Sequence, residues 1–204
     1  MHVWRADLTS TADAVTALLS AHERARAERF AHERDRLRWS RAHGVLRALL
    51  GRYLGGDPSE LRFTAGKHGK PALAQRPASC SFNLSHSGDL AAFAFSRTTE
   101  VGVDIEIAHG ARDEVALAER VFGVAYARSL EALAPAAREL EFLRRWVRYE
   151  AALKCQGVGL GASDAQRTGE RDLWIAELDG GPRGAAAVAA EQPPRELHCW
   201  DWRP

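Results

Sequence analysis

The sequence predicts an α+β fold, and two observations predict it. Apolar residues recur at helical spacing in two long segments, and they alternate with polar residues in several shorter ones. In chain order these segments give strand, helix, hairpin, helix and strand, which is typical of an α+β architecture. No obvious linker divides the 204 residues into independent domains.

The beginning of the chain predicts a strand followed by helices. Residues 2–8 resemble a short strand, and residues 9–19 predict a helix with a Ser/Thr/Asp-rich start suited to capping. Residues 35–54 carry apolar side chains at helical spacing, and Gly55 ends this helix. Arg38 continues the buried stripe of the helix, so we expect an anionic partner for its guanidinium.

The middle of the chain predicts a hairpin and two helices. Residues 90–95 and 101–107 are both strand-like and are joined by a short polar turn, so we expect them to pair. Residues 114–122 predict a helix, and a longer helix covers about residues 135–156, with Gly157 as its end.

The end of the chain carries weaker signals. Residues 173–178 and 197–202 predict strands. The stretch 179–194 between them is rich in small residues and predicts a mobile loop.

The composition argues against several classes of protein. Hydrophobic residues make up 46% and charged residues 27% of the chain, as in a soluble globular protein, and no apolar stretch is long enough to span a membrane. The first ten residues lack the apolar segment of a signal peptide, so we expect a cytosolic protein. The three cysteines are far apart and lack CxxC spacing, which argues against a disulfide framework and a structural zinc site.

Basic residues are concentrated near the start of the chain. Residues 22–52 contain nine arginines and four acidic residues, although the whole chain has a net charge of +1. The segment is either a solvated helix with internal ion pairs or a surface for phosphates or an acidic partner. Nucleic-acid binding is a further hypothesis, which the low net charge argues against.

Two carboxylates share one face of the strand predicted at residues 101–107. Asp104 and Glu106 are two residues apart, so their side chains point to the same side, about 6–7 Å apart at the backbone. Carboxylates at this spacing can converge on one hard cation such as Mg²⁺. The alternative is a solvent-facing strand with two exposed acids.

The long helix places two charged residues on its buried face. Its apolar stripe is Leu140, Leu143 and Val147, and Glu150 and Lys154 continue that stripe. Buried charges are costly unless they are paired or bound to a metal ion or an anionic ligand. Lys154 is also one of only three lysines among 28 basic residues. A structural pair between Glu150 and Lys154 at i,i+4 is the alternative.

A polar segment, Ser-His-Ser-Gly at residues 85–88, predicts a loop that opens a strand. Its hydroxyl groups, its imidazole and a glycine that allows close backbone approach suit phosphate oxygens. The chain has no G-x-S-x-G elbow, which argues against a Ser-His-Asp hydrolase.

Three motifs in this order closely resemble the signature of 4′-phosphopantetheinyl transferases. They are FNLSHSG at residues 82–88, VGVDIE at residues 101–106 and WVRYEAALKCQGVGL at residues 146–160. The chain length, Arg38 and the Gly-Lys-Pro turn at residues 69–71 resemble the larger, surfactin-synthetase-activating class of this family. The resemblance covers about residues 24–160.

The resemblance implies a fold and an activity. We expect two similar α+β halves related by a pseudo-twofold axis, at residues 1–98 and 99–204, with coenzyme A in the cleft between them. Such enzymes move the 4′-phosphopantetheine arm of coenzyme A to a serine of an apo acyl or peptidyl carrier protein and release adenosine 3′,5′-bisphosphate. Carrier proteins are typically acidic, and a chain with two such halves would not need to dimerise, so we expect a monomer.

The resemblance also implies the site residues. Mg²⁺ would be held, together with the coenzyme A pyrophosphate, by three acids: Asp104, Glu106 and Glu150. Coenzyme A would be bound by Arg38, Ser85 and His86 at its phosphates, with Lys70 near the nucleotide. Glu150 would take the proton of the carrier serine, directly or through a water molecule on the metal. Lys154 would stabilise or protonate the leaving phosphate.

The sequence departs from the family pattern at Tyr149, where the family usually has Lys before the motif Glu. A phenol supplies one hydrogen bond and no charge, so we expect weaker coenzyme A binding unless Arg145 or Arg148 compensates. A non-catalytic module that binds coenzyme A or a carrier protein is therefore the alternative function. The chain also stops soon after its last predicted strand, so we expect a smaller sheet in the second half.

Overall fold

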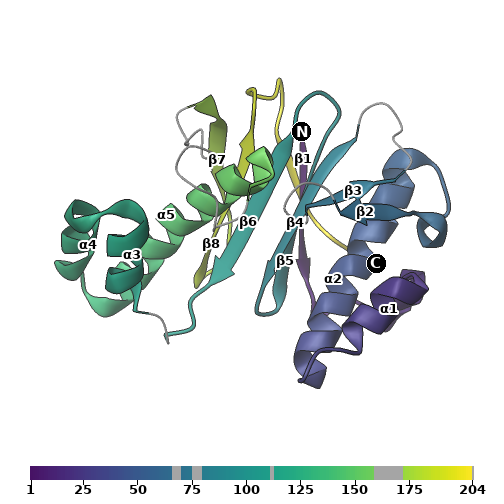
Figure 1. Ribbon diagram of the computed structural model, residues 1–204, viewed down its shortest axis with the longest axis horizontal. Helices are drawn as coiled ribbons and strands as arrows, with labels where there is room; N and C mark the ends of the chain where they lie inside the picture. Colours follow the sequence, from purple (N-terminus) through teal and green to yellow (C-terminus); the bar gives the residue numbers. More distant parts are fainter. Residues whose placement is uncertain (66–69, 75–79, 111–112, 159–171, 204) are drawn as a thin grey trace.

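The computed structural model describes residues 1–65, 70–74, 80–110, 113–158 and 172–203, and its strands form two main sheets (Figure 1). The first sheet has the order β4-β5-β1-β9, the second has the order β6-β8-β7, and β2 and β3 form a separate pair. The strands are β1 (His2–Asp7), β2 (Phe63–Ala65), β3 (Pro71–Leu73), β4 (Ser81–Ser87), β5 (Leu90–Ser96), β6 (Val101–Ile107), β7 (Trp174–Leu178), β8 (Gly184–Ala190) and β9 (His198–Asp201). The α-helices are α1 (Ala21–Ala27), α2 (Glu33–Leu54), α3 (Glu114–Phe122), α4 (Val124–Glu131) and α5 (Pro135–Gln156), and the 3₁₀ turns are η1 (Asp13–Leu18) and η2 (Pro58–Glu60).

The two main sheets pack face to face, and a long helix covers the outer face of each (Figure 1). α2 packs on the first sheet through a core that includes Leu46 and Phe93. α5 packs on the second sheet through a core that includes Val147 and Ala187. Between the sheets, apolar side chains of β6 and β8 meet those of β1 and β5. The result is a helix–sheet–sheet–helix arrangement, in which the inner strands are buried from both sides.

The two halves of the molecule repeat one order of elements. In the first half, β1 is followed by α2 and by the hairpin β4–β5, whose second strand pairs antiparallel with β1. In the second half, β6 is followed by α5 and by the hairpin β7–β8, whose second strand pairs antiparallel with β6. This repeat confirms the α+β class and is the arrangement expected of two similar halves.

The last strand joins the sheet of the first half. β9 pairs in parallel with β1, so residues 198–201, which the predicted boundaries place in the second half, extend the first sheet. The division of the chain into residues 1–98 and 99–204 stays a prediction.

The hairpin predicted between residues 90–95 and 101–107 is wrong. β5 pairs instead with β4 and β1, and β6 pairs with β8 in the other sheet. The Ser-His-Ser segment is the end of β4 rather than a loop, and Gly88 and Asp89 turn the chain into β5. Gly88 has φ of 55°, which glycine adopts at little cost, so this two-residue turn joins the strands that pair.

The mobile loop predicted at residues 179–194 is also wrong, because it contains β8. This strand consists mostly of alanine and lies buried between β6 and β7. A Cβ atom at Gly102 of β6 would lie 2.1 Å from the carbonyl oxygen of Ala151 in α5. α5 therefore lies close to this sheet, and the small residues on the face of the sheet that contacts α5 permit that approach.

The long helices were well predicted. α3 and α5 coincide with the predicted residues 114–122 and 135–156, and α2 begins two residues before its predicted start. Gly55 and Gly157 follow α2 and α5 with φ of 72° and 64°, the left-handed conformation that ends many helices. Residues 9–19 contain only the short turn η1, and α1 and α4 are helices that the sequence pattern does not predict. Within the described residues, no helix has the length and apolar character needed to cross a bilayer.

Several arginines of the segment 22–52 make structural ion pairs. Arg47 has a side chain only 1% exposed and pairs with Glu23 of α1 at 2.7 Å. Arg41 pairs with Asp13 at 2.8 Å. These pairs hold α1 and η1 against α2, so they join separate elements, whereas the interpretation of a solvated helix predicts pairs within one helix.

Candidate functional site

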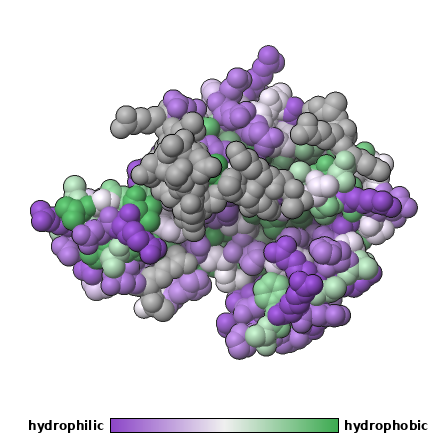
Figure 2. Space-filling model, viewed as in Figure 1, coloured by the Kyte–Doolittle hydropathy of each residue, from purple (hydrophilic) through white to green (hydrophobic). Residues whose placement is uncertain are grey.

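At one side of the face-to-face packing, the edge strands β4 and β6 of the two sheets lie next to each other, and we call this contact the seam. β4 ends the order of the first sheet and β6 ends that of the second. Ser85 Oγ of β4 donates a hydrogen bond to Asp104 Oδ1 of β6 over 2.7 Å. The molecular outline is notched between the lobe of α3 and α4 and the lobe of α1 and α2, on the side where β4 turns into β5 (Figures 1 and 2). The fold therefore places the predicted phosphate-binding motif and the acidic strand side by side.

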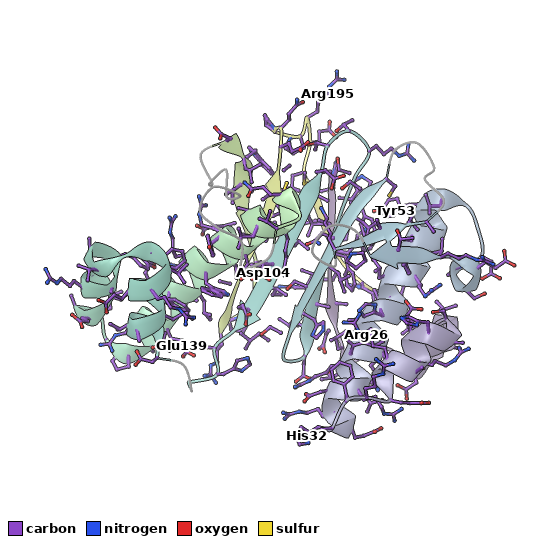
Figure 3. All side chains as sticks on the ribbon, viewed as in Figure 1. Arg26, His32, Tyr53, Asp104, Glu139 and Arg195 are labelled. Atoms are coloured by element: carbon purple, nitrogen blue, oxygen red, sulfur yellow. The ribbon has the colours of Figure 1, made fainter. Side chains whose placement is uncertain are left out.

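Asp104 is buried in the middle of the seam, with 3% exposure, between α5 and the first sheet (Figure 3). Lys154 Nζ donates to Asp104 Oδ1 over 2.6 Å and to Ser85 Oγ over 2.9 Å. Burial raises the pKa of Asp104, while the Lys154 ammonium and the hydrogen bonds from Lys154 and Ser85 oppose that rise. The ion-pair partner that the structure gives Lys154 is thus Asp104 on another element, rather than Glu150 one turn earlier in α5.

Glu150 brings a second carboxyl group to the seam, and this residue is half-buried. Its Oε1 atom is buried and accepts no hydrogen bond from the described residues. Burial raises the pKa of Glu150 to about 7, with a further rise from the Asp104 charge, opposition from Lys154 and a smaller rise from Glu106. A carboxyl group with this pKa can take up and release a proton at neutral pH, as a general base must.

Glu106 completes the acidic set. It is partly buried, and its Oε2 atom accepts a hydrogen bond from Ser87 Oγ over 2.8 Å. Its negative charge raises the pKa of both Asp104 and Glu150. The three carboxylates that the sequence singled out therefore lie within electrostatic reach of one another.

The donor set of the seam fits a hard divalent cation. Carboxylate oxygens are the ligands that Mg²⁺ takes in proteins, and the seam supplies three carboxylates. Two buried oxygens, Asp104 Oδ2 and Glu150 Oε1, lack a hydrogen-bond partner among the described residues, and a cation would satisfy them. Among the residues that the structure describes, no group of three or more His, Cys, Asp or Glu side chains is close enough together to hold a metal ion as it stands. Lys154 supplies the positive charge beside Asp104 in this arrangement.

Arg38 and His86 lie near the turn between β4 and β5. Arg38 pairs with Asp89 of that turn at 2.7 Å, which confirms the expected anionic partner. His86 lies on the opposite face of β4 from Ser85, as strand alternation requires. Partial removal from water lowers the pKa of His86, and the cations Lys154 and Arg38 lower it further. Contact of Arg38, Ser85 and His86 with coenzyme A phosphates stays a prediction.

Lys70 lies at the other end of the seam and is not brought to the acids. Its Nζ atom donates to Glu100 Oε2 and to the Val101 carbonyl oxygen, both over 2.9 Å. These bonds tie the start of β3 to the start of β6. Its predicted contact with the nucleotide stays a prediction. Residues 66–69 of the same turn, and the end of the third motif from residue 159 onward, lie outside the described residues.

Tyr149, which departs from the family pattern, takes part in an aromatic cluster. Its ring centroid lies 5.4 Å from that of Phe122 in α3 and 6.2 Å from that of Trp146. It also packs against Leu153 and Val158. A lysine at this position would lose these ring contacts, so the departure has a structural reason.

Sequence reasoning did not assign three polar residues that the structure places at the site. Asp89 pairs with Arg38, Asn83 accepts a hydrogen bond from the Val103 N–H group, and Ser87 contacts Glu106. One signal was visible: polar residues alternate at positions 83, 85 and 87, which a strand places on one face. A loop predicted at residues 85–88 does not imply this alternation, whereas the observed strand β4 does.

Comparison with known proteins gives the family. Residues 3–98 match the family model described as "4'-phosphopantetheinyl transferase, N-terminal", and residues 100–202 match the 4'-phosphopantetheinyl transferase superfamily model. The chain is 37% identical over 165 residues to the 4'-phosphopantetheinyl transferase HetI of Nostoc sp. (strain PCC 7120), which covers 78% of this chain and 70% of the relative.

Two further relatives carry the same description. The chain is 39% identical over 111 residues to the 4'-phosphopantetheinyl transferase AcpT of Salmonella typhimurium, covering 54% of this chain and 56% of the relative. It is 29% identical over 144 residues to the 4'-phosphopantetheinyl transferase Sfp of Bacillus subtilis, covering 71% of this chain and 62% of the relative. With two family models that together span nearly the whole chain, the protein belongs to the 4′-phosphopantetheinyl transferase superfamily.

Proposed function

We propose that this chain transfers the 4′-phosphopantetheine arm of coenzyme A to a serine of an apo acyl or peptidyl carrier protein and releases adenosine 3′,5′-bisphosphate. One observation carries the proposal. The seam brings together the buried Asp104, the half-buried Glu150 and the ammonium group of Lys154, and each of the two acids has one buried oxygen without a hydrogen-bond partner among the described residues. Membership of the superfamily supports the type of reaction.

The groups of the seam suit the proton and charge transfers of this reaction. The serine oxygen forms a bond to the β-phosphorus of coenzyme A, and the bond from that phosphorus to the bridging oxygen breaks. Glu150 would accept the serine proton, because its carboxylate lies at the seam within electrostatic reach of Asp104 and Lys154. The electron pair of the broken bond stays with adenosine 3′,5′-bisphosphate. Lys154 would stabilise the new negative charge on this leaving phosphate or would donate a proton to it.

Asp104, Glu106 and Glu150 would hold Mg²⁺ in this proposal. The ion would neutralise charge on the transferred and leaving phosphates. Ser85, His86 and Arg38 would bind the phosphates of coenzyme A. We also expect a monomer, since both strands of the seam come from one chain.

A labelling assay separates a transferase from a non-catalytic module that binds coenzyme A or a carrier. Purified protein is incubated with fluorescent coenzyme A, Mg²⁺ and a panel of apo acyl and peptidyl carrier proteins, and labelled carriers are read on a denaturing gel. We expect label on at least one carrier, and loss of label when a chelator removes Mg²⁺. Tight binding of coenzyme A with no covalent label on any carrier would favour the binding module.

A further inference from the structure

β4 presents a row of polar side chains to β6 along the seam. Ser81, Asn83, Ser85 and Ser87 alternate along the strand and therefore share one face. Each contacts a group 19 or 20 positions later in the chain, from Glu100 at one end of the seam to Glu106 and Ile107 at the other. This constant offset shows that β4 and β6 run parallel and in register, although they belong to different sheets.

These side chains satisfy backbone groups at the free edge of β6. β6 is the terminal strand of its sheet, so N–H groups on its outer edge have no neighbouring strand. The Val103 N–H group donates to Asn83 Oδ1 over 2.9 Å, and the Ile107 N–H group donates to Ser87 Oγ over 3.2 Å. The backbone of β6 is thus fixed on both sides of the segment that carries Asp104 and Glu106.

Ser87 makes two contacts with one hydroxyl group. It accepts from the Ile107 N–H group and donates to Glu106 Oε2 over 2.8 Å, and the residue is 8% exposed. A hydroxyl group that accepts from a fixed backbone donor has a restricted choice of direction for its own hydrogen. That hydrogen points at Glu106, so the orientation of this carboxylate is tied to the backbone of β6.

We propose that Ser87 is a positioning residue, which orients Glu106 toward the divalent cation that it would share with Asp104 and Glu150. This inference rests on the proposed function, because it takes the three acids as the ligands of that cation. Ser87 would act through Glu106 and would not touch the cation. A strand of the first half would then set the metal affinity of acids that lie in the second half.

The test measures metal affinity in the absence of substrate. Mn²⁺ replaces Mg²⁺ as a probe, and free Mn²⁺ is measured by electron paramagnetic resonance for the wild type, Ser87→Ala, Ser87→Thr and Ser81→Ala. We expect Ser87→Ala to weaken Mn²⁺ binding by roughly tenfold to a hundredfold, the usual effect of removing a partner of a metal ligand. Ser87→Thr keeps the hydroxyl group and should restore most of the affinity.

Ser81→Ala is the matched control. Ser81 lies on the same strand and face, but its hydroxyl group donates to Glu100, which is not one of the three acids. Equal Mn²⁺ affinity of the wild type and Ser87→Ala would overturn the inference and leave the proposed function standing. Equal weakening in Ser87→Thr or in Ser81→Ala would also overturn it, because the effect would then follow general disturbance of β4.

Two more measurements keep the test decisive. If Ser87→Ala does not fold, as judged by its thermal unfolding, Ser87→Cys keeps a small side chain with the same connectivity and replaces the hydroxyl group with a poor donor, and it should show the same weakening. If the wild type itself binds no Mn²⁺, the metal site of the proposed function fails, and this inference fails with it.

Discussion

Lys154 of α5 and Asp104 of β6 form a partly buried ion pair, with Lys154 Nζ 2.6 Å from Asp104 Oδ1. The Asp104 side chain is 4% exposed and the Lys154 side chain is 28% exposed. The pair joins the helix to the strand at the point where Glu150 also enters the seam. The contribution of this ion pair to the free energy of unfolding can therefore be measured without any substrate.

Breaking this pair should destabilise the protein. Lys154→Met leaves the Asp104 carboxylate buried without a counterion and should lower the free energy of unfolding by roughly 3 kcal/mol, near the low end for a buried pair because Lys154 is partly exposed. Combining it with Asp104→Asn should recover a large part of that loss. Urea unfolding of the single and double variants gives the coupling energy.

The exposed pair between Arg36 and Glu33 in α2 is the control for that cycle. Removing Arg36 should change the free energy of unfolding very little, because water and salt screen exposed pairs. A coupling energy for Lys154 and Asp104 no larger than that of the surface pair would contradict the structure at this point.

Replacing Glu150 should remove the base without unfolding the protein. We expect Glu150→Gln to lower the rate of carrier labelling about 10²–10⁴-fold, because a positioned general base contributes about that much. Steady-state labelling with fluorescent coenzyme A checks the rate, and circular dichroism checks the fold. Labelling by Glu150→Gln at the rate of the wild type would show that this carboxylate is not the base.

The pH dependence of stability should report the half-buried Glu150 carboxyl group directly. Its pKa is raised from an ordinary 4.5 to about 7 in the folded protein, so between these values the folded state holds more protons than the unfolded state. This residue therefore makes stability fall as pH rises from about 4.5 to about 7, with no further loss above that range.

Glu150→Gln lacks this titration and isolates it. Relative to the wild type, the variant should gain stability as pH rises from about 5 to about 7 in metal-free buffer. Thermal unfolding of both proteins in the presence of a chelator measures the difference. A difference that does not change with pH would mean that Glu150 is not buried as the structure has it.

The close approach of α5 to β6 depends on Gly102. A Cβ atom there would lie 2.1 Å from the Ala151 carbonyl oxygen and 2.3 Å from the Cys155 N atom, and both are backbone atoms of the helix that carries Glu150 and Lys154. We expect Gly102→Ala to cost about 1–3 kcal/mol of unfolding free energy, as overpacking of a core does. The same change should reduce transfer, because it moves the helix away from Asp104.

Gly56→Ala provides the comparison for this variant, since a Cβ atom at Gly56 would meet nothing within 4 Å. Chemical unfolding and carrier labelling of both variants test the prediction. Equal stability and activity of Gly102→Ala and Gly56→Ala would show that the helix does not lie as close to the sheet as described.

The acidic part of the site could be predicted because its signals are local. Alternation in β6 puts Asp104 and Glu106 on one face, and helical spacing puts Glu150 and Lys154 on the buried stripe of α5. The ends of α2 and α5 could also be predicted, because a glycine follows each helix. Such features depend only on residues that are a few positions apart.

The rest of the fold depends on contacts that are distant in the sequence. β5 and β6 are adjacent in the chain and look like a hairpin, but β6 finds its partner β8 more than 70 residues later. The alanine-rich β8 has little intrinsic preference for a strand, and its small residues are explained by the close packing of α5 on one face and of the first sheet on the other. The partner of Lys154 was missed for the same reason, because Asp104 lies 50 positions away.

The most direct test of the central claim is the intact mass of candidate apo carrier proteins after incubation with this protein, coenzyme A and Mg²⁺. The three carboxylates and Lys154 at the seam predict a carrier heavier by one phosphopantetheine group with the wild type, and no gain with Asp104→Ala, whose folding is verified separately. An equal gain in mass with Asp104→Ala, or none with the folded wild type across acyl and peptidyl carriers, would contradict the account.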